Sequence, residues 1–187
     1  MVFNQPKNIF NGMEEVNISS KKYILTYGII LGIVSIIYNS ILYITDNMMN
    51  INLIEGGIDL AILICVITYG IYSYKTANKG FLELSKAIKI GIGIAIIGAL
   101  TLIIWIVLLM NVIEPEMINQ IAEVQYKEMI SNNPDISQEE IDENIVSIKT
   151  INSSYVKSAM SLVSNLLFGF LIALMGGAIM QKKRDIY

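Results

Sequence analysis

Residues 87–113 read AIKIGIGIAIIGALTLIIWIVLLMNVI, and Lys89 is the only charged residue in this run. A helix needs about 20 apolar residues to cross the roughly 30 Å hydrocarbon core of a bilayer. Lipid offers the backbone no hydrogen-bond partner, so a continuous apolar run of this length predicts a transmembrane helix, in which the backbone bonds to itself. The run is longer than this minimum, which predicts a tilted helix.

Three further runs have the same character: 23–44, 53–74 and 156–180. The composition agrees, because 54% of the 187 residues are hydrophobic and only 16% are charged, whereas a soluble domain carries about 25% charged residues. The sequence therefore predicts an all-α integral membrane protein, with three transmembrane helices in 23–113 and a fourth at 156–180. The polar segment 1–22 lacks the features of a cleaved signal peptide, so we expect the first run to remain as an anchor.

The distribution of basic residues predicts the orientation. Ten of the thirteen Lys and Arg residues lie in 1–22, around the connection between the second and third runs, or in the tail 181–187. Cytoplasmic segments of membrane proteins are enriched in Lys and Arg. We therefore expect a multi-pass protein of a bacterial inner (cytoplasmic) membrane with both termini in the cytoplasm and with 114–155 outside it.

The segment 114–155 is acidic, with nine Asp and Glu residues between Glu114 and Glu143. Pro115 cannot continue the hydrogen-bond ladder of the third span, but it fits the first turn of a new helix. Apolar residues then recur at helical spacing as far as the turn sequence NNPD at 132–135. This pattern predicts one short amphipathic helix.

A second short helix is predicted after this turn. Ser137 followed by Glu140 is a capping box, and isoleucines follow at helical spacing. We expect the two helices to fold as a hairpin, whose apolar faces have three interpretations. They pack on each other and on the membrane surface, they bind a membrane or periplasmic protein through 117–150, or the acids hold a cation. The third has least support because the acids lack EF-hand spacing and its turn glycine.

Small residues recur every four positions in each predicted span, and this spacing lets helix backbones approach closely. Two interpretations are open: the small residues pack the chain's own bundle, or some of them form the face of a homo-oligomer. Trp105 is expected to face lipid or to pack, with no site implied. The small residues are Gly28 and Gly32; Gly57, Ala61 and Cys65; Gly91, Ala95 and Ala99; and Gly169, Ala173 and Gly177.

Glu55 and Asp59 are the only acidic residues inside a predicted span, and they lie one turn apart on the same face of the second helix. Residues at similar depth in the first and fourth spans predict a polar cluster open to the outside, formed by Glu55, Asp59, Asn39, Ser161 and Asn165, with Ser35 one turn deeper. The cluster has two interpretations. It is a structural hydrogen-bond network, or it is a site for a cation, a proton or a small polar solute.

Catalytic patterns are missing from this sequence. It contains no histidine, one cysteine, no nucleophile elbow and no phosphate-binding glycine loop. We therefore expect no enzyme, cofactor, metal site or nucleic-acid partner. The leading hypothesis is a non-catalytic interaction or scaffold subunit; the alternative is a small transporter or channel subunit that uses its intramembrane carboxylates for cation or proton coupling.

Several short features, in their order along the chain, resemble the bacterial four-span membrane family called domain of unknown function 4199. The resemblance implies the topology and a bacterial membrane location, and it carries over no activity or catalytic residue. Leu84 and Ser85 depart from the aromatic residue and glycine expected there. The matching features are Tyr27-Gly28 with Gly32, Gly80-Phe81 running through Ala87 to Gly91, Glu114-Pro115-Glu116, Ser137-Gln138-Glu139-Glu140, and the glycine-bearing last span that ends in Lys182-Lys183.

Overall fold

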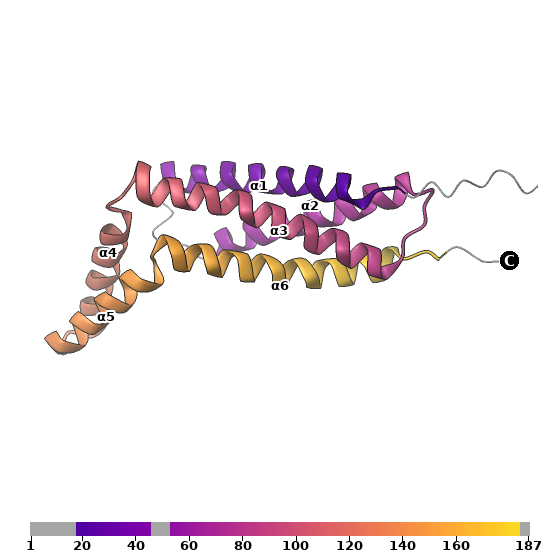
Figure 1. Ribbon diagram of the computed structural model, residues 1–187. Coiled ribbons are helices and arrows are strands. Elements are labelled where there is room, and N and C mark those ends of the chain that lie inside the picture. Colours follow the sequence, from indigo (N-terminus) through magenta and orange to yellow (C-terminus); the bar gives the residue numbers. More distant parts are fainter. Residues whose placement is uncertain (1–17, 46–52, 184–187) are drawn as a thin grey trace, which may run out of the picture.

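The computed structural model describes residues 18–45 and 53–183, which form a long helical bundle with a bent arm at one end (Figure 1). This confirms the predicted all-α architecture with four helices long and apolar enough to cross a membrane. Three of them begin two or three residues earlier than predicted, because polar residues extend the helices beyond the apolar runs. The four helices are α1 (Ser20–Ile44), α2 (Leu53–Ala77), α3 (Leu84–Leu108) and α6 (Ser154–Met180).

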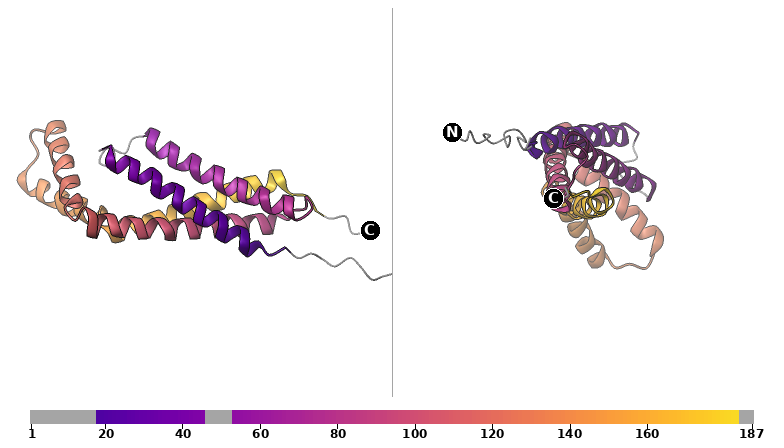
Figure 2. Two further views of the ribbon diagram at one scale, coloured as in Figure 1. Left: turned by 90° about the horizontal axis from the view of Figure 1, so that it is seen from above. Right: turned by 90° about the vertical axis from the view of Figure 1, so that its right-hand side faces the viewer.

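Parts of the predicted terminal segments 1–22 and 181–187, and most of the first connection, lie outside the described residues. Within the bundle, α3 contacts α1, α2 and α6, and its contacts with α1 and α6 are the most extensive. Figure 2 shows α1 and α2 crossing α3 and α6 obliquely. The buried core lies where these helices meet, and it includes Ile67, Ile71, Ile90, Ile94 and Ala173.

Small residues bring α3 and α6 into backbone contact. A Cβ atom added at Gly91 would overlap Ala173 Cβ, and one added at Gly169 would lie 2.5 Å from Ala95 Cβ. One turn further along, a Cβ at Gly177 would lie 2.7 Å from Ala87 Cβ. The two helices therefore present matching stripes of Gly and Ala, and dispersion contacts between closely spaced backbones hold them together.

The other face of α3 receives α1 by the same device. Gly28 lies against Ile97, since a Cβ atom added at this glycine would lie 2.5 Å from Ile97 Cβ, and Gly32 lies against Thr101. Gly98 of α3 receives Leu31, which is almost fully buried. These glycines thus pack the chain's own bundle rather than a face for a second copy.

The stripe on α2 behaves differently from its prediction. Gly57, Ala61 and Cys65 are exposed, and no atom lies within 4 Å of a Cβ added at Gly57. The reason is that α2 contacts the bundle through a different face and mainly through its second half, where Ile67 and Ile71 are fully buried. Of the two interpretations of this stripe, packing of Gly57 and Ala61 within the chain's own bundle is therefore wrong for the described residues, and a face for a second copy stays a prediction.

A tight turn and a two-residue bridge close one end of the bundle. After α2, Lys79 and Gly80 adopt positive φ angles of 58° and 82°, and Gly80 N donates to Lys75 O at 2.9 Å. Leu82 and Lys182 then exchange backbone hydrogen bonds of 3.0 and 2.9 Å. The Lys182 ammonium lies 5.6 Å from the centre of the Phe81 ring. The end of α6 is thereby attached to the turn between α2 and α3.

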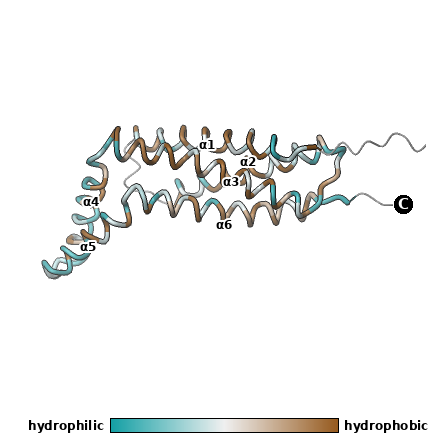
Figure 3. The backbone as a smooth tube through the Cα atoms, viewed as in Figure 1, coloured by the Kyte–Doolittle hydropathy of each residue, from teal (hydrophilic) through white to brown (hydrophobic). Residues whose placement is uncertain are grey.

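The opposite end carries the predicted pair of short helices, α4 (Met117–Asn132) and α5 (Gln138–Ile151), which together we call the hairpin. Ser137 Oγ accepts a hydrogen bond from Glu140 N at 3.2 Å, as expected of an N-cap. α3 reaches α4 through a short π-helix, η2 (Leu109–Ile113), and Pro115 lies in the turn before α4 rather than in its first turn. Figure 3 shows that the hairpin is much more hydrophilic than the bundle.

Candidate functional site

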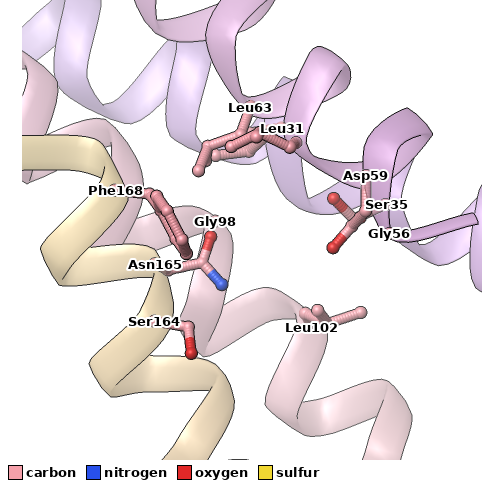
Figure 4. A pocket seen from close by; sticks show the side chains of 11 residues that line it. Leu31, Ser35, Gly56, Asp59, Leu63, Gly98, Leu102, Ser164, Asn165 and Phe168 are labelled. Carbon is pink, nitrogen blue, oxygen red and sulfur yellow. The ribbon is translucent and has the colours of Figure 1, made fainter. Parts of the chain in front are cut away.

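The four spanning helices enclose a cavity of about 190 Å³ that we call the Asp59 cavity. Figure 4 shows the Asp59 carboxylate and the Asn165 amide pointing into the same space. Apolar side chains surround these polar groups, as in most small-molecule sites. The lining consists of Leu31 and Ser35 from α1, Gly56, Asp59, Leu60 and Leu63 from α2, Gly98 and Leu102 from α3, and Ser164, Asn165 and Phe168 from α6.

The predicted polar cluster is only partly assembled at this cavity. Asp59, Asn165 and the deeper Ser35 line it, whereas Glu55, Asn39 and Ser161 do not. Asn39 Nδ2 donates to Ser35 O within α1 at 2.9 Å. The Ser161 carbonyl accepts from Asn165 Nδ2 within α6, also at 2.9 Å. Tyr38 OH donates to the backbone carbonyl of Glu55 at 2.9 Å. This hydrogen bond links α1 to α2 about one turn from the Ser35 and Asp59 residues that line the cavity.

Several lining residues were not predicted. Gly98 and Leu102 come from α3, which contributed nothing to the predicted cluster, and Phe168 lies one turn after Ser164 on α6. Ser164 could have been found, because it is a polar residue beside Asn165 within an apolar span. The leucines and Phe168 could not, because apolar residues in a span look the same whether they face lipid, a neighbour or a cavity.

Asp59 has no hydrogen-bond or ion-pair partner among the described residues. Its side chain is exposed where the cavity opens, and the other residues that line the cavity are uncharged. Glu55 lies one turn away on the same helix but does not line the cavity. An ionised carboxylate at the centre of a bilayer costs at least about 2.5–3.5 kcal/mol, and a smaller amount near its surface. An acidic side chain placed here without a partner marks the Asp59 cavity as the first candidate site.

Comparison with known protein families agrees with the resemblance seen in the sequence. The model of the family described as "Protein of unknown function (DUF4199)" matches residues 26–182. The chain belongs to this family. No curated protein and no solved structure matches it.

The matched part of this DUF4199 chain begins in α1 and ends at Lys182, so it includes the Asp59 cavity, the hairpin and the Leu82–Lys182 bridge. It also includes two buried polar atoms without a hydrogen-bond partner among the described residues, Trp105 Nε1 and Ser158 Oγ. Trp105 packs beside the base of the hairpin, as expected of a packing residue. Neither atom lines the Asp59 cavity.

The hairpin of this DUF4199 protein is the second candidate site. Its base is fixed to the bundle, because Met117 and Ile121 of α4 are buried with Leu109 and Met110. Glu114 adds two hydrogen bonds there, since its carboxylate accepts from Tyr43 OH at 3.1 Å and from Gln120 Nε2 at 2.9 Å.

Elsewhere on the hairpin, where α4 and α5 contact each other, Ala122 and Ile141 are buried, whereas the charged side chains are exposed. On α4, Lys127 Nζ lies 2.7 Å from Glu123 Oε1, and this hydrogen bond and the Lys127 charge hold the pKa of the Glu123 carboxyl below its ordinary value. The exposed acids nearer the tip have no ion-pair partner among the described residues. We call them the tip acids: Glu128, Asp135, Glu139, Glu140, Asp142 and Glu143.

Proposed function

We propose that this chain is a non-catalytic interaction subunit of a bacterial inner membrane, and that its hairpin binds a protein partner with a basic surface on the extracytoplasmic side. The observation that carries this proposal is the arrangement of the hairpin, whose base is held by the bundle while its acidic tip extends beyond it (Figure 1). Unpaired charges of one sign favour a partner of the opposite sign and speed its encounter.

The proposed orientation is supported by the charges at the two ends of the bundle. The turn between α2 and α3 and the end of α6 lie together at one end, and this end carries Lys75, Lys79, Lys86, Lys182 and Lys183. The hairpin lies at the opposite end (Figure 1). Enrichment of basic residues at the cytoplasmic side therefore supports cytoplasmic termini and an extracytoplasmic hairpin.

A protein partner accounts for the hairpin better than the membrane surface does. A helix that lies on a bilayer has an apolar face towards the lipid and basic residues on its polar face, which attract anionic headgroups. The tip acids have the opposite charge. Val146 of α5, which is 65% exposed, supplies apolar contact area on the same helix as four of the tip acids, as expected at a protein interface.

The experiment is a mild-detergent purification of the full chain from its native membrane, followed by mass spectrometry of the proteins that co-purify. We expect a stoichiometric partner that is lost from the triple variant Glu139→Gln, Glu140→Gln and Glu143→Gln. The matched control is the double variant Glu123→Gln and Lys127→Gln, which removes one paired acid and one base without changing net charge. It should retain the partner. A partner retained by the triple variant, or the absence of any partner, would contradict the proposal.

The Asp59 cavity favours a second function, that of a small transporter or channel subunit with cation or proton coupling. In that case Glu55→Gln combined with Asp59→Asn should abolish uptake into vesicles that contain the purified protein. The same double variant should leave an interaction subunit bound to its partner. Deletion of 117–150 should have the reverse effects, provided that the shortened chain still inserts.

A further inference from the structure

The Asp59 cavity is a cleft with a floor and a mouth. Its floor consists of buried residues from the middle of the bundle, namely Leu31 and Ser35 of α1, Leu63 of α2, and Gly98 and Leu102 of α3. Its exposed lining residues belong to two helices only, with Gly56, Asp59 and Leu60 on α2 and Ser164 and Phe168 on α6. The mouth therefore lies between α2 and α6, on the side where the first half of α2 is exposed.

Hydrogen-bond acceptors dominate the polar part of this cleft. The Asp59 carboxylate accepts no hydrogen bond and forms no ion pair among the described residues. Asn165 uses one N–H of its amide to bond to Ser161 O, which leaves the acceptor Oδ1 and one N–H without a partner among the described residues. The Ser35 hydroxyl, on the floor, also has no partner among the residues described. The missing complement is a cation that carries hydrogen-bond donors.

A bare metal ion fits this lining poorly. Calcium takes six to eight oxygen ligands, and magnesium requires an octahedron of them, usually with several bound waters. The described residues contain no group of three or more His, Cys, Asp or Glu side chains that could hold a metal ion. At about 190 Å³, the cavity is also several times larger than the roughly 30 Å³ that one water molecule occupies.

The apolar lining points to an organic cation. Leu31 and Leu63 lie together on one side of the Asp59 carboxylate, and Leu102 lies on another side (Figure 4). Phe168 adds an aromatic ring at the mouth, and aromatic rings attract ammonium groups. We propose that the Asp59 cavity binds a small amphiphilic ammonium compound, with its ammonium group on Asp59 and Asn165 and its apolar part against the leucines. A mouth between two spanning helices gives such a molecule access from the bilayer.

The test uses the full-length protein in nanodiscs of zwitterionic lipid, with n-hexylammonium as the probe and n-hexanol as its uncharged counterpart. Isothermal titration calorimetry, corrected with empty nanodiscs, should show saturable binding of hexylammonium and only unsaturable partitioning of hexanol. Asp59→Asn keeps the shape of the side chain and removes its charge, so binding should weaken at least about tenfold. Glu123→Gln, which removes a carboxylate on the hairpin, should bind the probe as the unmodified protein does.

A second variant keeps the test decisive if Asp59→Asn does not fold. Asn165→Leu retains the volume but loses the acceptor, and it should weaken binding of hexylammonium several-fold. Equal binding of hexanol and hexylammonium, or no saturable binding of either, would overturn the proposal. So would sodium chloride alone giving a saturable heat that depends on Asp59, because the site would then take an inorganic cation.

Discussion

α3 and α2 have the same length and carry small residues at the same spacing, but they use them differently. On α3 the small residues face α6 on one side and α1 on the other, where Gly91, Ala95 and Gly98 are all buried. On α2 the corresponding stripe begins at Gly57 and is exposed along its length. The comparison shows that a four-residue spacing identifies a face on which a backbone can be approached closely, but not whether another helix lies there.

The largest expected effect comes from closing the α3–α6 contact. Gly91→Val places a Cβ atom where Ala173 Cβ already lies, so the two helices must separate. We expect the free energy of unfolding to fall by about 3 kcal/mol, near the upper end of the range for an overfilled core. Unfolding in dodecyl maltoside micelles with increasing sodium dodecyl sulfate, followed by far-ultraviolet circular dichroism, measures this change. An unchanged midpoint would show that α3 does not depend on close contact with α6.

A smaller loss of stability is expected from a substitution in the turn that joins α2 to α3. Gly80 has a φ of 82°, and a residue with a Cβ atom is disfavoured in this conformation by about 1–2 kcal/mol. Gly80→Ala should lower the free energy of unfolding by that amount in the same assay. Gly80→Asn should recover part of the loss, because Asn tolerates positive φ better than Ala does. Equal losses from both variants would point to a cause other than backbone conformation.

The packed half of α2 should respond less strongly than α3. A Cβ atom at Gly70 would lie 2.6 Å from Ile94 Cδ1 and 3.1 Å from Tyr27 Cγ. The Ile94 methyl is the end of a flexible side chain and can move, so we expect Gly70→Ala to cost about 1 kcal/mol, at the low end for overpacking. A loss of unfolding free energy as large as that of Gly91→Val would mean that α2 depends on tight packing as much as α3 does.

The smallest effect is expected at the exposed stripe of α2. Gly57→Val meets no atom within 4 Å, so the free energy of unfolding of the monomer should change by less than about 0.5 kcal/mol. The same variant, examined by size-exclusion chromatography with light scattering, also tests whether the stripe joins two copies. An overpacked contact costs about 2 kcal/mol. If the free energy of unfolding of the monomer fell by that much, Gly57 would have a neighbour within the bundle.

The sequence predicted the four long helices and the hairpin because hydropathy, turn residues and capping residues act locally. It also predicted that Asp59 and Asn165 lie at a common depth, since the rise per residue of a helix is fixed. It did not predict that Glu55 and Asn39 fall outside the cavity, or that Leu102 lines it. Which residues line the cavity depends on the rotation of each helix about its own axis and on the tilt of α2 relative to its neighbours. Residue spacing along one helix determines neither of these.

The order of α3 and α6 along the chain has a consequence for biogenesis. Domains form progressively as a chain is synthesised from its N-terminus. α3 can pair with α1 and α2 as soon as they are in the membrane, but its Gly91 side, which α2 contacts through Ile67, lacks Ala173 until α6 has been made. During that interval Leu82 also waits for Lys182, the residue with which it exchanges backbone hydrogen bonds. A nascent chain stalled before Ser154 should therefore leave the Ala87, Gly91 and Ala95 face of α3 uncovered by α6.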